Sequence, residues 1–407
     1  MNLLVQTNHP NIQAHLAITG SKSETNRLLL LQALFPNITL ENTSNSDDSE
    51  VMQKALNRQD QVVDIHHAGT AMRFLTAFFA VSEGSEVELT GSQRMTERPI
   101  KVLVDTLKQL GATISYKNQV GYPPILIKGQ KITASKVTIP ANVSSQYISA
   151  LLLVAPKLEN GIELTLEGEI TSVPYIKMTL ALLNDLGIAT RFTANTIQVS
   201  AAKSVPTKVM TVESDWSSAS YFFSIVALAD AASITLSSFA QNSLQGDSAL
   251  VAIYKQMGVS SEFKDNSLTL TKTADFKPKA IHLDLNNTPD IAQTIVVTCF
   301  GLGLSCHLTG LHTLKIKETD RLEALQTEMT KLGAVVRVTN DSLTLEPATV
   351  RHPKVKIATY NDHRMAMAFA PLALKMPIVI ENAEVVSKSY PDFWEDLTKL
   401  NFSTTQV

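Results

Sequence analysis

Residues 324–347 read ALQTEMTKLGAVVRVTNDSLTLEP, and this stretch decides the fold class. Leu325, Met329 and Leu332 recur at helical spacing, and Gly333 follows them as a stop signal. After the glycine, apolar and polar residues alternate on both sides of a short polar turn, as they do in a β-hairpin. We therefore predict a helix over about residues 319–332, followed by two strands.

The same pattern of helix, glycine and strands occurs four times in the chain. Its copies cover residues 103–118, 179–200, 249–272 and 324–347, and their glycines are Gly111, Gly187, Gly258 and Gly333. Spacings of about 70 to 75 residues exceed the common solenoid periods and suit a unit of two helices and several strands. The sequence thus predicts an α/β fold built from repeated modules. The helices between these copies are apolar all round, so we expect them to be buried.

Composition bounds the class of protein. A chain of 407 residues with 44% hydrophobic residues and a formal charge of −3 has material for more than one domain. We see no export signal, no apolar run of membrane length and no basic stripe interleaved with aromatic residues. Cys299 and Cys306 form no CxxC pair and have no histidine at ligand spacing. We therefore expect a cytoplasmic protein without a membrane or nucleic-acid partner, and two core cysteines.

Positively charged residues recur where predicted helices begin. Lys22 and Arg27, Arg73, Arg98 ahead of Pro99, Lys317 with Arg321, and Arg364 all have this placement. Pro99 suits a first helical position, which would put Arg98 at the cap. A cation at the positive end of a helix dipole is favourable chiefly when it shares an anion with that end. The set therefore favours a strongly anionic ligand.

The alternative for one such stretch, KIKETDRLEAL at residues 315–325, is a solvated surface. Glu318 and Asp320 would then screen Lys317 and Arg321, whose mutual repulsion on a helix costs about 0.2 to 0.5 kcal/mol.

Serine-rich openings add neutral donors at two more predicted helices. NVSSQYISA supplies Ser144, Ser145 and Gln146, and TSVPYIKM supplies Ser172 and Tyr175. Serine caps are common, so a structural role is the alternative for each of them. The chain has neither a GxxxxGK nor a GxGxxG motif, so a nucleotide held by a P-loop is not indicated.

Eight motifs in order along the chain resemble the 5-enolpyruvylshikimate-3-phosphate synthase family. They are GSKSETNR, AGTAMRFL, RMTERP, SSQ, SDWSSASYFF, NSLQGD, KIKETDR and YNDHRMAMA, and they span nearly the whole sequence. The resemblance implies a two-lobed enolpyruvyl transferase fold, an inside-out α/β barrel in which each lobe holds βαβαββ repeats. One lobe would be residues 20–213, and the other would join residues 1–19 to 214–407, with the active site in the cleft between the lobes.

The resemblance also implies the reaction. Family members transfer the enolpyruvyl group of phosphoenolpyruvate to the 5-hydroxyl of shikimate 3-phosphate and release phosphate. The residues that match the family's shikimate 3-phosphate contacts are Lys22, Ser23, Arg27, Ser144, Ser145, Gln146, Ser172, Tyr175, Asp290, Thr313 and Lys317. Those that match its phosphoenolpyruvate contacts are Lys22, Gly69, Arg73, Arg98, Gln146, Arg321, Arg364 and Lys388.

The catalytic residues implied by the resemblance are Asp290, Glu318 and Lys22. The chemistry needs a base for the hydroxyl proton and an acid for the methylene carbon. For Asp290 the alternative is an ordinary acid at a helix start. His363 is expected to be a hydrogen-bonding neighbour. No metal or organic cofactor is expected, the partners are the two small-molecule substrates, and we expect a monomer.

Two departures from the family pattern bear on these expectations. Segment 49–66 is short, so we expect the first repeat to be trimmed on its outer side, and His67 stands where the family has asparagine. The enzyme alternative is the enolpyruvyl transferase acting on UDP-N-acetylglucosamine, but GSQRMTERP lacks that family's cysteine. The other alternative is a catalytically silent anion-binding protein, which the retention of Asp290 and Glu318 disfavours.

Overall fold

The computed structural model describes residues 1–7, 9, 11–58, 60–141, 144–170, 173–277, 279–347 and 352–407. The chain forms two compact units: unit 1 holds Met1–Thr19 and Glu213–Val407, and unit 2 holds Gly20–Val212. The sequence predicted that the second lobe would resume after residue 213, and in the structure unit 1 resumes at Glu213. Among the described residues, no helix combines the length and the apolar character that crossing a membrane requires.

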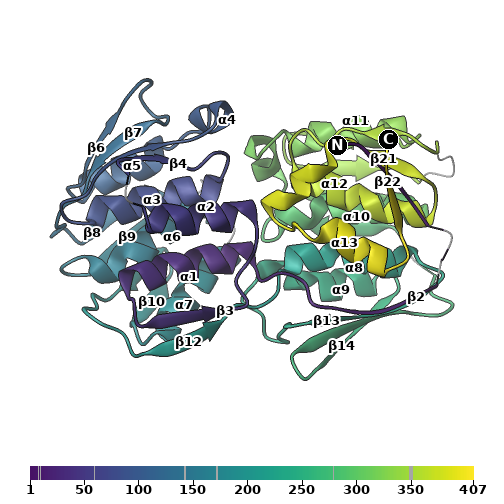
Figure 1. The fold of residues 1–407 in the computed structure, drawn as a ribbon, viewed down its shortest axis with the longest axis horizontal. Coiled ribbons are helices and arrows are strands. Elements are labelled where there is room, and N and C mark those ends of the chain that lie inside the picture. Colours follow the sequence, from purple (N-terminus) through teal and green to yellow (C-terminus); the bar gives the residue numbers. More distant parts are fainter. Residues whose placement is uncertain are drawn as a thin grey trace. The chain divides into compact units, whose positions relative to one another are not determined.

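Unit 2 contains three modules of strands and helices (Figure 1). The first comprises β12 (Lys208–Thr211), α1 (Lys22–Leu34), β3 (Ile38–Glu41) and α2 (Asp47–Leu56). The second comprises β4 (Val62–Asp64), α3 (Gly69–Val81), β5 (Glu86–Thr90), α4 (Gln93–Thr96), α5 (Lys101–Gln109), β6 (Thr113–Tyr116) and β7 (Ile125–Lys128). The third comprises β8 (Lys136–Pro140), α6 (Ser145–Val154), the 3₁₀ turn η1 (Ala155–Lys157), β9 (Ile162–Glu167), α7 (Val173–Asp185), β10 (Thr190–Thr193) and β11 (Thr196–Val199).

Unit 1 also contains three modules. The first comprises β2 (Asn11–Leu16), α8 (Trp216–Leu228), β13 (Ala231–Ser237), η2 (Gly246–Ala249), α9 (Leu250–Lys255), β14 (Val259–Lys264) and β15 (Ser267–Lys272). The second comprises β16 (Ile281–Asp284), η3 (Pro289–Ile291), α10 (Ala292–Leu302), β17 (Cys306–Thr309), η4 (His312–Ile316), α11 (Arg321–Lys331), β18 (Val336–Val338) and β19 (Leu343–Leu345). The third comprises β20 (Lys356–Ile357), α12 (His363–Phe369), η5 (Ala370–Leu374), β21 (Ile378–Ile380), η6 (Ala383–Lys388), α13 (Phe393–Lys399), β22 (Ser403–Gln406) and the N-terminal β1 (Leu3–Gln6).

Four modules share one sheet plan, in which two parallel strands are followed by an antiparallel hairpin, and the third module of unit 1 completes the same plan with the antiparallel strands β1 and β22. The orders β4-β5-β7-β6, β16-β17-β19-β18 and β14-β15-β13-β2 are examples. Each predicted repeat supplies the second helix and the hairpin of one such sheet. The repeat glycines have the predicted role, because Gly111, Gly187, Gly258 and Gly333 have φ between 80° and 104°, which favours glycine.

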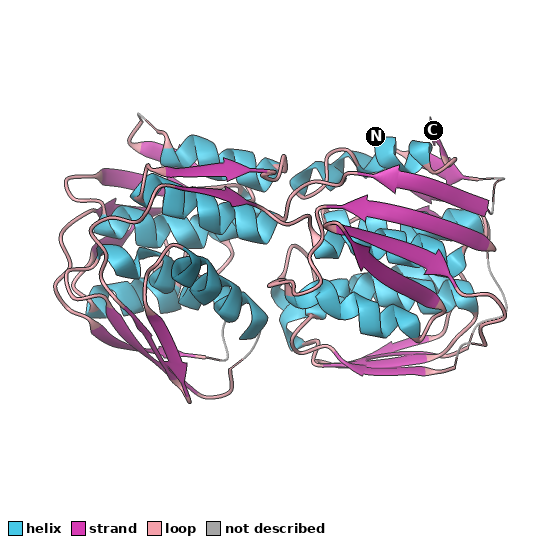
Figure 2. Ribbon diagram, turned by 90° about the horizontal axis from the view of Figure 1, so that it is seen from below, coloured by secondary structure: helices cyan, strands magenta, loops and turns pink. Residues whose placement is uncertain are grey.

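In each unit, helices form the interior and sheets form the outside, as Figure 2 shows. Strands such as β13 alternate buried and partly exposed residues, so one face packs on helices and the other meets solvent. Helices α6, α8 and α10 are buried on nearly all sides, as their apolar sequences predict. Cys299 and Cys306 are buried free thiols, as predicted.

The first module of unit 2 is the exception and confirms the expected trimming. Its sheet has two strands, β12 and β3, paired in parallel. Helix α2 ends at Leu56 and β4 begins at Val62, so the chain passes directly to the next module where the others build a hairpin. The carbonyl of Ile38 accepts a hydrogen bond from Nε2 of Gln32 (2.9 Å), which satisfies this group without a further strand.

Candidate active site

A group of charged side chains in unit 1 surrounds Arg321, the first residue of α11. Its side chain is 2% exposed and meets three carboxylates. Nε donates to Asp362 (2.6 Å), Nη1 to Asp290 (2.8 Å) and Nη2 to Glu318 (2.7 Å). These acids come from three places in the sequence, so the guanidinium joins the beginnings of α11 and α12 to η3. We call these four residues, with Lys317 and Arg364, the acid–arginine cluster.

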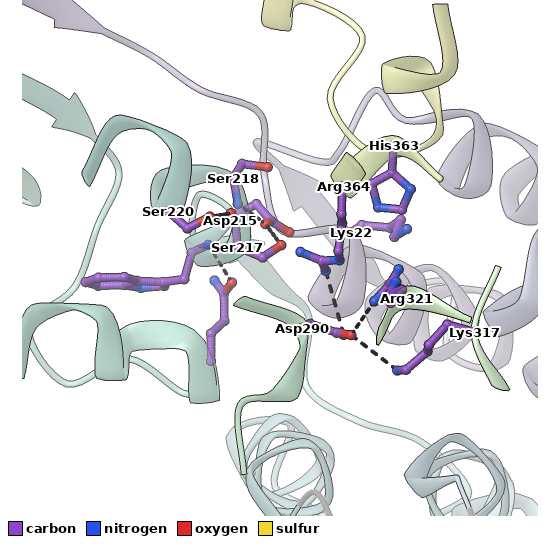
Figure 3. A network of polar contacts seen from close by, with 12 residues as sticks. Lys22, Asp215, Ser217, Ser218, Ser220, Asp290, Lys317, Arg321, His363 and Arg364 are labelled. Atoms are coloured by element: carbon purple, nitrogen blue, oxygen red, sulfur yellow. Dashed lines mark hydrogen bonds and ion pairs between the residues drawn. The ribbon is translucent and has the colours of Figure 1, made fainter. Parts of the chain in front are cut away.

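Asp290 lies between the three cations of this cluster (Figure 3). Its Oδ1 is 3.3 Å from Nζ of Lys317, and its Oδ2 is 3.7 Å from Nη2 of Arg364. Burial by itself would raise the pKa of Asp290, but Lys317, Arg364 and Arg321 together outweigh burial and hold that pKa well below its usual range. Asp290 is therefore ionised near neutral pH.

The charges of the cluster balance. It holds three cations, Lys317, Arg321 and Arg364, and three carboxylates, Asp290, Glu318 and Asp362. Burial would lower the pKa of Arg321, but Asp362, Glu318 and Asp290 raise it above its ordinary value. A further anion would therefore add net negative charge to a group that is already neutral.

The structure corrects the expected beginning of this helix. Helix α11 covers Arg321–Lys331 rather than 319–332, and Asp320 is its N-cap, accepting from the N–H groups of Leu322 and Glu323. Lys317 precedes the helix and follows η4, so it does not share the helix dipole with Arg321. The anion that brings Lys317 and Arg321 together is the protein's own Asp290, and the solvated-surface alternative is wrong for Arg321.

Three more predicted residues lie in unit 1. Oγ1 of Thr313 is buried and has no hydrogen-bond partner among the described residues. His363 is buried with Nδ1 3.8 Å from Asp362, consistent with a neighbour of the cluster. Nζ of Lys388 donates to the backbone oxygen of Asn361 (2.6 Å), just before α12.

In unit 2, Arg27 is bound inside the helical core. Nε donates to Thr179 (2.9 Å), Nη1 to the carbonyl of Ser23 (2.6 Å), and Nη2 to Ser149 (3.0 Å) and the carbonyl of Tyr175 (3.5 Å). Burial lowers the pKa of Arg27 to about 10, although the Tyr175 side chain and Glu24 oppose the shift. These partners hold the guanidinium inside unit 2, and its contact with shikimate 3-phosphate stays a prediction.

Gly69, Arg73 and Arg98 form a second group in unit 2. Nη1 of Arg73 donates to the carbonyl of Gly69 (3.0 Å) and Nη2 to that of Pro99 (3.2 Å), so Arg73 links the start of its own helix to the residue that follows Arg98. A Cβ at Gly69 would lie 2.5 Å from Nη1 of Arg98. No described residue accepts a hydrogen bond from the Arg98 side chain, so this partly buried guanidinium is available to an anion at the beginning of α3.

The expected cap at Arg98 is wrong. Helix α5 begins at Lys101 with Ile100 as its N-cap, and the short helix α4 ends at Thr96. Pro99 lies between the two helices, where its carbonyl accepts from Arg73 and from the Tyr147 hydroxyl (2.6 Å).

The remaining predicted residues of unit 2 lie at helix beginnings. Lys22 is the first residue of α1, and its Nζ is 3.3 Å from Asp48 in α2. Ser144 caps α6 and Ser145 begins it, while Nε2 of Gln146 donates to Thr70 of α3 (3.0 Å). Ser172 lies outside the described residues.

A surface cavity of about 410 Å³ lies beside the trimmed module. It is lined by α2, including Asp48, and by residues 60–68, including His67. The cavity thus touches Asp48 of the Lys22–Asp48 pair, whereas the acid–arginine cluster is in the other unit. Within the described ranges, no three His, Cys, Asp or Glu side chains are grouped as a metal site requires.

The sequence interpretation missed Asp362 and Asp48. Asp362 caps α12 by accepting from the N–H of Arg364 (2.9 Å), and its second oxygen binds Arg321. Its signal was present in YNDHR, where an aspartate precedes a helix opening that carries a cation. Asp48, in SDDSE, has the same kind of signal at the start of α2.

Comparison with known proteins places the chain in context. Residues 39–397 match the family model for EPSP synthase (3-phosphoshikimate 1-carboxyvinyltransferase). A 3-phosphoshikimate 1-carboxyvinyltransferase from Bacteroides fragilis strain YCH46 is 45% identical over 395 residues, covering 96% of both chains. A protein of that name from Actinobacillus pleuropneumoniae serotype 5b is 34% identical over 427 residues, covering 97% of this chain and 98% of the relative. That alignment is longer than the 407 residues of this chain, so the relative holds residues that this chain lacks.

A solved structure of EPSP synthase from Acinetobacter baumannii superposes with a TM-score of 0.81. The match covers 100% of both chains at 20% sequence identity. At this identity the likeness concerns the fold.

Proposed function

The chain belongs to the EPSP synthase (3-phosphoshikimate 1-carboxyvinyltransferase) family, and from this premise we propose that the acid–arginine cluster performs its proton transfers. The reaction of the family moves the enolpyruvyl group of phosphoenolpyruvate to the 5-hydroxyl of shikimate 3-phosphate, in the shikimate pathway to aromatic compounds. The chain is an enzyme of this reaction. Its substrates are small anionic molecules.

The chemistry is an addition followed by an elimination. The 5-hydroxyl oxygen bonds to C2 of phosphoenolpyruvate while its proton leaves to a base, and an acid places a proton on C3, which becomes a methyl group. The tetrahedral intermediate then loses phosphate from C2 and a proton from the methyl group, which restores the double bond. Each half of the reaction therefore needs one group that gives a proton and one that takes it.

The observation that carries the proposal is the convergence of Asp290 and Glu318 on the guanidinium of Arg321. Asp290 is ionised, because three cations hold its pKa well below the usual range. Such a carboxylate is a poor proton donor, and it is also a weak base until substrate anions engage Lys317 and Arg364, so we assign Asp290 to the 5-hydroxyl in the substrate-bound state. We assign the proton transfer at C3 to Glu318, which is 27% exposed and contacts Arg321 at 2.7 Å.

The substrate contacts follow from charge and available donors. We propose that Arg364 and Lys317 bind anionic groups of the substrates, with Arg321 joining them when the substrate displaces a carboxylate. In unit 2 we propose Arg98 and Lys22 for the phosphate of phosphoenolpyruvate, supported by the available guanidinium of Arg98. Thr313 can bond a substrate hydroxyl through its buried, unpartnered Oγ1.

Other predicted residues are proposed in supporting roles. Arg27, Ser23 and Tyr175 form one bonded group in unit 2, and Gly69 and Arg73 lie beside Arg98 and Pro99; all five also remain proposed substrate contacts from the family resemblance. Ser144, Ser145, Gln146, Ser172 and Lys388 remain proposed ligand contacts from the family resemblance. The proposal requires residues of both units to act on the same substrates. A cytoplasmic location, a monomeric state and the lack of a nucleic-acid partner stay predictions.

Deuterium exchange at C3 tests the assignment of the two carboxylates. With both substrates in D₂O, reversible addition exchanges the methylene protons of phosphoenolpyruvate with solvent. We expect Glu318→Gln to lose this exchange, measured by proton NMR, while still binding shikimate 3-phosphate. Exchange at the wild-type rate in Glu318→Gln would remove Glu318 from the C3 proton transfer.

A further inference from the structure

Asp247 is a buried carboxyl group that the proposed reaction does not use. It is the second residue of η2, and only 6% of the residue is exposed. Its Oδ1 is buried without a hydrogen-bond partner among the described residues. A buried carboxylate oxygen without a donor is unfavourable, so either a proton or a ligand must compensate it.

Comparison of two modules explains why Asp247 has no cationic partner at the start of the first helix of its own module. In the trimmed module, Asp48 is the second residue of α2, and it pairs with Lys22, the first residue of α1. Asp247 has the corresponding place in η2 of the β2–α8–β13–α9 module, where the first residue of α8 is Trp216 and its cap is Asp215. Unit 1 therefore has an aromatic residue and a second carboxylate where unit 2 has an ammonium group.

The charged surroundings of Asp247 connect it to the acid–arginine cluster. Burial raises the pKa of Asp247 to about 7, Arg364 and Lys317 oppose this rise, and Asp290 and Asp215 add to it. Asp247 thus titrates near neutral pH, and its protonation depends on cations that the proposed function assigns to substrate.

The two helices packed against η2 add no strong cation near this carboxyl group. Helix α8 contributes Asp215 at its start and Tyr221, whose pKa burial raises above its ordinary value. Helix α9 contributes Tyr254, which is bonded to Thr298 (2.9 Å), and the exposed Lys255 at its last position.

We propose that Asp247 is a positioning residue that takes up one proton from solvent when an anionic substrate group binds Lys317 and Arg364. This inference rests on the proposed function of the cluster. Before binding, the cluster holds three cations and three carboxylates, and Lys317 and Arg364 also stabilise the nearby Asp247 carboxylate. A bound anion pairs with those cations and adds negative charge, which raises the pKa of Asp247. Asp247 then takes a proton from solvent, and this proton offsets part of the added negative charge.

The sign of the pH effect follows from this order of events. Below about pH 7 Asp247 is already protonated, so anion binding needs no further proton. Above it, binding must be accompanied by proton uptake, and the apparent affinity falls by about tenfold per pH unit until the pKa of the bound state is reached. Substrate ionisation adds its own pH dependence, which is the same for every variant.

The test compares the KM for phosphoenolpyruvate, at saturating shikimate 3-phosphate, between about pH 6 and pH 9. The variants are Asp247→Asn, Asp247→Glu and the control Asp230→Asn, whose side chain is 68% exposed. We expect the ratio of wild-type KM to Asp247→Asn KM to rise by about tenfold across one pH unit above neutrality. Asp247→Glu and Asp230→Asn should keep the wild-type pH dependence.

A constant KM ratio for Asp247→Asn across this pH range would overturn the inference. If that variant does not fold, infrared difference spectra of the wild-type enzyme decide the question. Adding phosphoenolpyruvate and shikimate 3-phosphate at about pH 8 should increase the signal of protonated carboxyl groups, and no increase would refute the proposal. A wild-type enzyme that releases no phosphate from its substrates at any pH would instead refute the proposed function.

Discussion

Oδ1 of Asp290 lies 2.8 Å from Nη1 of Arg321, and the same oxygen lies 3.3 Å from Nζ of Lys317. A single carboxylate oxygen therefore joins two cations that the sequence places four residues apart. Because Arg321 also binds Glu318 and Asp362, the cations of this site are neutralised by the protein before any substrate is present. Substrate binding must redistribute these pairs, which makes the carboxylates part of both recognition and chemistry.

Glu318→Gln should lower kcat by on the order of 100-fold or more, because an amide cannot give or take the proton at C3. Glutamine keeps the size of the side chain and can still accept from Nη2 of Arg321, so we expect binding of shikimate 3-phosphate to be retained. The matched control is Glu323→Gln, an exposed acid in the first turn of α11. Near-normal kcat for Glu318→Gln in a phosphate-release assay would exclude this role.

Asp290→Asn should also lower kcat by on the order of 100-fold or more, with measurable substrate binding. The substitution removes the negative charge shared by Lys317 and Arg321, so we further expect these cations to bind anions more readily. Inorganic phosphate should then inhibit the variant at lower concentration than the wild-type enzyme. Unchanged phosphate inhibition, measured by competition with phosphoenolpyruvate, would contradict this view of the cluster.

Asp362→Asn should destabilise unit 1 by about 3 to 5 kcal/mol, because it leaves the buried Arg321 without one of its charged partners. Asparagine can still cap α12, so the loss reports the ion pair. Urea unfolding can be followed by the fluorescence of Trp216 and Trp394, which both lie in unit 1.

The control for Asp362→Asn is Asp320→Asn, which changes the cap of α11, where asparagine is about as good a cap. We expect its free energy of unfolding to stay within about 0.5 kcal/mol of wild type. Equal losses in the free energy of unfolding for the two substitutions would show that the Arg321–Asp362 ion pair does not stabilise unit 1 as proposed.

Gly69→Ala should raise the KM for phosphoenolpyruvate by about 10- to 100-fold, the loss of one charge-assisted contact. The new Cβ would lie 2.5 Å from Nη1 of Arg98, and the flexible arginine would move rather than the helix backbone. In an Arg98→Ala background the same glycine change should have little further effect. An equal effect in both backgrounds would show that Gly69 acts independently of Arg98.

The architecture was predictable because it is encoded locally and repeated. Gly333 and its three counterparts end helices through positive φ, and alternating residues after each glycine mark the hairpins. The trimmed module was predictable from the short segment 49–66, and the two-stranded β12–β3 sheet confirms it.

The site was less predictable because its partners come from distant segments. Arg321 was singled out as a cation at a helix beginning, but its partners Asp362 and Asp290 lie 41 and 31 residues away and meet it only through packing. Arg27 and Arg73 were singled out as ligand cations, and their protein partners could not be read from the sequence: hydroxyl groups of Thr179 and Ser149 for Arg27, and the carbonyls of Gly69 and Pro99 for Arg73. The prediction that Pro99 begins a helix with Arg98 as its cap is wrong, because Ile100, the residue after Pro99, caps α5.

The central claim is that this chain is an enolpyruvyl transferase with shikimate 3-phosphate as its acceptor. Phosphate release from phosphoenolpyruvate tests it most directly, with shikimate 3-phosphate and UDP-N-acetylglucosamine offered in parallel. We expect turnover with shikimate 3-phosphate and none with the nucleotide sugar. Turnover with UDP-N-acetylglucosamine alone, or with neither acceptor, would contradict the account.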